Sequence, residues 1–194
     1  MPKVLIACKV LEKELIHALP PGAEVEVVWL EAGLHASLSR LEAALGEAID
    51  NAAGSGRKVC LLYGQGCHPE IRSFLEKHGV GALPVKNCIE ALLGSNAPEI
   101  KDTKTMLMTP GWVRAWPAMM EALGWNEVDA RINLGRYERI LVLDAGIEPL
   151  TDEETLVFFD LVQVPLEIRK IDLSVLRKLL AELLGERQQT SSAA

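Results

Sequence analysis

The sequence predicts an α/β fold with a mostly parallel, open sheet and helices on both faces, an architecture of the Rossmann-like kind. Three observations predict it. The chain of 194 residues contains short apolar runs, it contains segments with apolar residues at helical spacing, and the two kinds alternate throughout. Hydrophobic residues make up 49% of the chain, which is enough to build one core.

The apolar runs define the expected strands. "KVLIAC" and "RILVLDAG" are continuous apolar runs, typical of parallel strands that are buried on both faces. "EVEVVWL" alternates and is rich in valine, whereas "GALPVK" is weakened as a strand by its proline. We expect strands at residues 3–8, 24–30, 58–64, 81–86, 105–108, 139–146 and 166–173.

The amphipathic segments define the expected helices. Leu38, Leu41, Leu45 and Ile49 share one helical face, and "PPG" and "GSG" are clear helix stops. Helices are expected at residues 11–19, 34–56, 70–79, 87–95, 113–125, 126–137, 151–163 and 174–185.

The length favours one α/β domain over residues 1–185, followed by a flexible tail at 186–194. A division into two similar halves, about 1–100 and 101–185, is the alternative. It is suggested by the likeness of "VLIAC" and "LVLDAG", two buried strands that each end at a small residue.

The formal net charge of −7 argues against nucleic-acid binding, which usually needs a basic face. No apolar run approaches the ~20 residues needed to span a bilayer, so no membrane association is expected. The first residues do not form a secretory signal. We therefore expect a cytoplasmic protein whose four cysteines are reduced, which favours metal binding or thiol chemistry over disulfides.

Reactive side chains follow four consecutive expected strands. Cys8 ends the first strand, His35 follows the second, Cys67 ends the third, and Cys88 follows the fourth. Ligands bind at the carboxyl ends of the strands in open α/β sheets, so these four residues are expected to meet. Three thiolates and one imidazole suit tetrahedral zinc or an iron–sulfur cluster.

Alternatives remain for several of these residues. His68 stands beside Cys67 and is an alternative fourth ligand to His35. Cys60 lies inside a strand and is expected to act only as a small hydrophobic side chain. Cys88 is expected at a helix N-terminus, which lowers the pKa of a thiol.

The same edge of the sheet is expected to bind a small molecule. Gly64 and Gly66 permit close approach of a cofactor or of backbone, and Trp112 follows a Pro-Gly turn where it could form a pocket wall. The alternative for Trp112 is packing with the other tryptophans between helices. Asp144 ends a strand and is expected either to orient a ligand or to cap its own turn.

Taken together, the motifs "LIAC", "LH", "YGQGC", "NCIEALLGS" and "TPGW" resemble those of a bacterial and archaeal family known only as a domain of unknown function. The resemblance covers most of the chain, with Cys8, His35, Cys67, Cys88 and Thr109–Trp112 on the motif positions. It implies an association with corrinoid-dependent methyltransferase systems, and hence contact with a corrinoid, a corrinoid protein or a methyltransferase.

Three functions follow from these observations. The first is a zinc or iron–sulfur protein with a role in one-carbon and corrinoid methyl metabolism. The second is a module that binds a small molecule or a methyltransferase partner without catalysis. The third is a metal-free isomerase or racemase with two thiols, which is disfavoured because the second half of the chain contains no cysteine.

Overall fold

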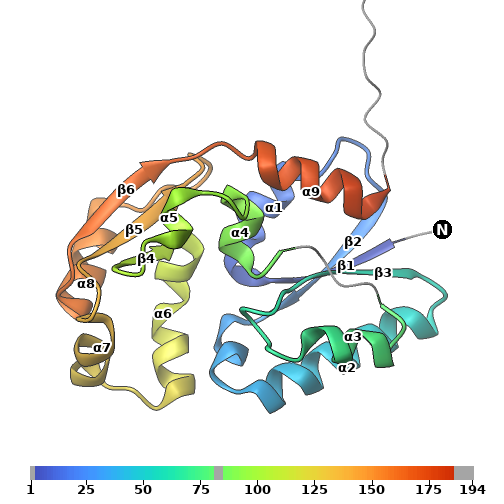
Figure 1. The fold of residues 1–194 in the computed structure, drawn as a ribbon, viewed down its shortest axis with the longest axis horizontal. Coiled ribbons are helices and arrows are strands. Elements are labelled where there is room, and N and C mark those ends of the chain that lie inside the picture. Colours follow the sequence, from blue (N-terminus) through green and yellow to red (C-terminus); the bar gives the residue numbers. More distant parts are fainter. Residues whose placement is uncertain (1–2, 81–84, 186–194) are drawn as a thin grey trace, which may run out of the picture.

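The computed structural model describes residues 3–80 and 85–185, and these residues form two three-stranded sheets with helices packed around them (Figure 1). Every strand pair is parallel and both sheets are open, which confirms the predicted α/β class. The strands are divided between two sheets rather than joined in one. None of the described helices is long and apolar enough to cross a lipid bilayer.

The first sheet and its helices come from the N-terminal part of the chain. In chain order they are β1 (Lys3–Cys8), the 3-10 helix η1 (Lys9–Leu11), α1 (Glu12–Ala18), β2 (Val25–Leu30), the 3-10 helix η2 (Ala32–Ala36), α2 (Leu38–Gly54), β3 (Lys58–Leu62), α3 (Ile71–Lys77) and α4 (Cys88–Leu93). The strand predicted at 81–86 falls largely on residues 81–84, which lie outside the described residues.

The second sheet follows a short connecting helix. The remaining elements are α5 (Pro98–Lys101), β4 (Thr105–Met108), α6 (Pro110–Leu123), α7 (Glu127–Leu134), β5 (Arg139–Asp144), α8 (Asp152–Val162), β6 (Leu166–Lys170) and α9 (Ser174–Leu184). The strand orders are β2-β1-β3 in the first sheet and β4-β5-β6 in the second.

The central strand of each sheet is the most hydrophobic one. In β1 the side chains of residues 4–7 are fully buried, and in β5 those of residues 140–143 are buried as well. Helices cover both faces of these strands, so a continuous apolar run suits them better than an alternating one. The two runs that are most apolar in the sequence therefore became the centres of the two sheets.

The last helix returns to the first half of the molecule. Figure 1 shows α9 running from β6 back across the first half, where it packs beside α1 and α4. Leu176, Leu180 and Leu184 are buried in the same core as β1. The C-terminal segment thus completes the core that the N-terminal segment begins.

The start of α6 joins the two halves. Thr109 is completely buried, and its hydroxyl donates to the carbonyl of Val10 at 3.2 Å while accepting from the amide of Trp112 at 3.2 Å. Pro110 occupies the first turn of α6, where its missing N–H costs nothing. A Cβ placed on Gly111 would lie 2.1 Å from the oxygen of Val10, so only glycine permits this contact.

Replacing Gly111 with alanine tests this junction. We expect Gly111→Ala to lower the free energy of unfolding by about 1–3 kcal/mol or more, because the new methyl group meets rigid backbone. Urea unfolding followed by circular dichroism measures the effect.

Gly54→Ala is the matched control, since a Cβ there meets nothing within 4 Å and the backbone is not left-handed. It should be neutral or should stabilise by about 0.4–1 kcal/mol. Equal stability of the two variants would show that the Gly111 contact is not a tight junction.

Candidate functional site

Three segments of the first half meet at the carboxyl edge of its sheet. Cys8 is the last residue of β1 and pairs with Leu30, the last residue of β2. His35 lies in η2, directly after β2, and Cys67 lies in the turn after β3. Since β1 is hydrogen-bonded to both β2 and β3, all three segments leave the sheet as neighbours.

Cys88 reaches this edge by a different route. It is the first residue of α4, and the segment leading to it crosses the turn after β3, where the amide of Gly66 donates to the carbonyl of Lys86 at 2.7 Å. A Cβ on Gly64 would lie 2.1 Å from the oxygen of Val85. The close approach that Gly64 and Gly66 permit is therefore to the chain itself, and their contact with a cofactor stays a prediction.

The thiols of Cys8, which is buried, and of Cys67 and Cys88, which are half-buried, form a group that we call the thiol cluster. Burial raises the pKa of Cys8 from its ordinary value of 9.0 to about 11 and that of Cys88 to about 12, and it also raises the pKa of Cys67. A charge on Cys67 further raises the pKa of both other thiols. The thiols are close enough to affect one another, and all three hold their protons at neutral pH.

The expectation of a lowered pKa at Cys88 is wrong, because its pKa is raised overall. The amide of Ile89 and the indole of Trp112 do favour the Cys88 thiolate, but burial outweighs both. A thiol that remains protonated is a poor nucleophile and a poor general base. In this state the thiol cluster supplies no ready thiolate.

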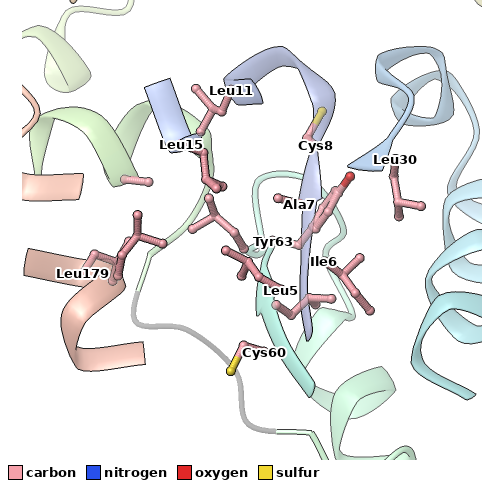
Figure 2. Close-up of a cluster of buried hydrophobic side chains, with 14 of the residues drawn as sticks. Leu5, Ile6, Ala7, Cys8, Leu11, Leu15, Leu30, Cys60, Tyr63 and Leu179 are labelled. Atoms are coloured by element: carbon pink, nitrogen blue, oxygen red, sulfur yellow. The ribbon is translucent and has the colours of Figure 1, made fainter. Parts of the chain in front are cut away.

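Tyr63 is a member of the site that the sequence did not reveal. It follows β3, is buried, and directs its hydroxyl toward the Cys8 sulfur and Leu30 (Figure 2). The hydroxyl favours the Cys8 thiolate, although it makes no hydrogen bond of ordinary geometry within the described residues. Its place at the end of "VCLLY", directly before the glycine turn, was the signal available in the sequence.

His35 lies between two aromatic side chains of the site. Its ring stacks on Tyr63 with 6.0 Å between centroids and meets Trp112 edge to face at 5.5 Å. Its Nδ1 lies 3.1 Å from the carbonyl oxygen of Ala32, which can only accept, so Nδ1 carries the proton. Burial lowers the pKa of His35, so the ring is neutral and its Nε2 offers a lone pair.

Trp112 contacts the thiol cluster directly. Its indole Nε1 donates to the Cys88 sulfur at 3.4 Å. Trp116 and Trp125 instead pack against each other, with 6.4 Å between ring centroids, in the second half of the molecule. Trp112 thus lies at the thiol cluster, and its role as a pocket wall stays a prediction.

The other candidate residues have different surroundings. His68 is buried, with Nε2 3.8 Å from the Glu42 carboxylate and its ring near Phe74, so its neighbours lie on α2 and α3. The Cys60 sulfur points away from Cys8 and lies 3.7 Å from the carbonyl oxygen of Leu183 on α9 (Figure 2).

Asp144 caps its own turn. Its carboxylate accepts from the amide of Gly146 at 2.7 Å and forms an ion pair with Lys170, the residue opposite it on β6. Both interactions lie within the second half, and they account for the aspartate without a ligand.

Within residues 3–80 and 85–185, no three His, Cys, Asp or Glu side chains already stand at the distances that would hold a metal ion. The thiol cluster and His35 are neighbours without being a preformed coordination shell. Any metal bound there would require the side chains to rotate and the thiols to release their protons.

Comparison with known proteins identifies a family. A family model described as "Protein of unknown function (DUF1638)" matches residues 29–180. That range contains His35, Cys67, Cys88 and Trp112 and begins after Cys8. No curated protein and no solved structure matched the chain in these comparisons.

The raised thiol pKa values predict a loss of stability in alkali. The folded protein holds these protons more tightly than the unfolded chain, so the stabilisation is complete below pH 9 and is lost as the pH rises toward 11 to 12. The free energy of unfolding should fall by up to about 1.4 kcal/mol per pH unit for each thiol.

Urea unfolding from pH 8 to 11, with reductant and chelator, compares the wild type with Cys88→Ser. The wild type should lose stability more steeply above pH 9, because the variant lacks one of the titrating thiols. Parallel slopes for the two proteins would contradict the assigned shift.

Proposed function

Because the chain belongs to the DUF1638 family, whose function is unknown, its chemistry has to be inferred from its own geometry, and we propose that the thiol cluster is a binding site for a soft metal ion, with zinc as the first candidate. The observation that carries the proposal is the gathering of three thiols, one buried and two half-buried, from three separate segments. Thiolates are the ligands that zinc and iron–sulfur clusters prefer.

A bound cation would stabilise the thiolate form of the cluster. Burial and mutual repulsion both disfavour the thiolates, and a divalent ion would offset both effects by neutralising the charges. Binding would then release protons, so affinity should rise with pH.

His35 supports zinc over an iron–sulfur cluster as the first candidate. Histidines that bind metals usually donate their second ring N–H to a carbonyl or carboxylate, as His35 does toward Ala32. A neutral imidazole with a free Nε2, next to three thiols, matches the Cys3His set of many zinc sites. His68 is the less suitable fourth ligand because its neighbours lie on α2 and α3.

The role in one-carbon metabolism is a further part of the proposal. The sequence resemblance supports a corrinoid protein or a corrinoid-dependent methyltransferase as the partner of a thiolate-bound metal. Co-purification with such a protein, compared between wild type and a variant lacking the thiol cluster, tests this part separately.

Metal content distinguishes the proposal from a module without a metal. Anaerobically purified protein should hold about one zinc per chain by elemental analysis, and Cys67→Ser should lose most of it, because a serine hydroxyl is a much weaker ligand. Visible absorption and bound iron would instead indicate a cluster.

Cys60→Ser is the matched control and should leave the zinc content unchanged. Cys60 pairs with Leu5 inside the sheet, and its sulfur lies near the carbonyl oxygen of Leu183, away from Cys8. Metal-free wild-type protein after reconstitution, or equal metal loss in both variants, would overturn the proposal.

Trp112→Phe tests the hydrogen bond to the cluster. Removing the N–H that reaches the Cys88 sulfur should weaken metal binding by about 10–100-fold, the range found for partners of metal ligands. Competition with a chelator measures the affinity, and the thiolate absorption of the cobalt-substituted protein should shift. Trp125→Phe, in the second half, should change neither quantity.

A further inference from the structure

A large cleft opens between the two halves, next to the thiol cluster. Its volume is about 780 Å³, within the range of small-molecule sites. Residues of both halves line it, from the segments that follow β1, β2 and β5 and from one side of α6 along most of its length. It therefore lies at the carboxyl ends of both sheets, where open α/β folds bind their ligands.

Glu14 is the unusual side chain of this cleft. It lies on α1, is only 5% exposed, and forms part of the cleft lining. Within the part of the chain that the structure describes, its carboxylate has no ion pair, and no other residue donates a hydrogen bond to it. Carboxylates buried to this degree are normally paired.

The surroundings of Glu14 disfavour its charged form. Burial raises its pKa, and the nearby carboxylates of Asp144 and Glu148 raise it further, whereas Arg114 lowers it. Arg114 is already held by Glu154, with 2.7 Å between Nε and Oε1. A ligand that donates hydrogen bonds or carries a positive charge would favour the Glu14 carboxylate.

Most other basic side chains of the cleft already form ion pairs with carboxylates. Lys9 pairs with Glu31 at 2.8 Å, and Lys13 pairs with Glu148 at 3.0 Å. Among the described residues that line the cleft, Glu12, Glu14 and Glu121 form no ion pair, against Arg40 alone among the bases. The cleft carries an excess of free negative charge.

The cleft has room because its walls consist of small side chains. Gly33 and three alanines of α6 line it, and a Cβ on Gly33 would reach the methyl of Ala122 at 3.4 Å. No aromatic side chain belongs to the lining. Recognition of a ligand here would depend on charge and hydrogen bonds rather than on stacking.

We propose that this cleft binds a small organic cation with N–H donor groups, and that the buried Glu14 carboxylate is its main hydrogen-bond acceptor. The site is distinct from the thiol cluster, and the proposal does not depend on a bound metal. The two sites are adjacent, because Val10, Leu34 and Gly111 line the cleft next to Cys8, His35 and Trp112 in the chain.

Three probes with the same four-carbon chain test the proposal: butane-1,4-diamine, butane-1,4-diol and succinate. Isothermal titration calorimetry at neutral pH should detect saturable binding of the diamine and at least tenfold weaker binding of the diol and of succinate. Glu14→Gln, which keeps shape and removes charge, should weaken diamine binding at least tenfold.

Glu76→Gln is the control, because Glu76 is exposed on α3 outside the cleft and its replacement removes the same charge. It should bind the diamine as the wild type does. Ala118→Leu fills the cleft from α6 and should abolish binding, which keeps the test decisive if Glu14→Gln does not fold.

Equal binding of the three probes, no saturable binding of the diamine, or full binding by Glu14→Gln or Ala118→Leu would each overturn the proposal. Loss of metal in the Cys67→Ser variant has no bearing on these outcomes. The two proposals can therefore fail separately.

Discussion

The arrangement of the two halves depends on one close contact, between the start of α6 and the backbone of Val10. Gly111 brings the helix against the Val10 carbonyl, and the Thr109 hydroxyl bonds the same oxygen. From that fixed point Trp112 extends to the Cys88 sulfur, and the following turns of α6 form a wall of the cleft. The first turn of α6 thus fixes the junction between the halves and also places Trp112 at the thiol cluster.

Burial is the second constraint, and it explains the character of both candidate sites. It keeps the thiols protonated and His35 neutral, and it disfavours the charged form of Glu14. Burying a charged or polar group costs free energy unless a partner or a ligand forms a hydrogen bond or an ion pair with it. A soft metal ion at the thiol cluster and an organic cation beside Glu14 would each supply the positive charge that the neighbouring side chains do not provide.

Much of the fold could be predicted from the sequence, because β1 and β5 are continuous apolar runs and Leu41, Leu45 and Ile49 lie at helical spacing along α2. Strand pairing could not be predicted, since the pattern of a buried strand does not identify its neighbours. The sequence therefore predicts one sheet where the structure has two. Glu14 was missed although it shares the helical face of Leu11, Leu15 and Ala18, where a carboxylate is out of place. Contacts across the chain, such as Trp112 to Cys88, leave no local pattern to find.

The return of α9 to the first half has a consequence for biosynthesis. The core around β1 includes Leu180 and Leu184, so it cannot close until nearly the whole chain has left the ribosome. The second half, whose own core comes from residues 108–164, has no such dependence on the C-terminal helix. The nascent chain would therefore expose the apolar face of β1 and the Cys8 thiol for most of its synthesis, and truncation before α9 should yield an aggregation-prone product.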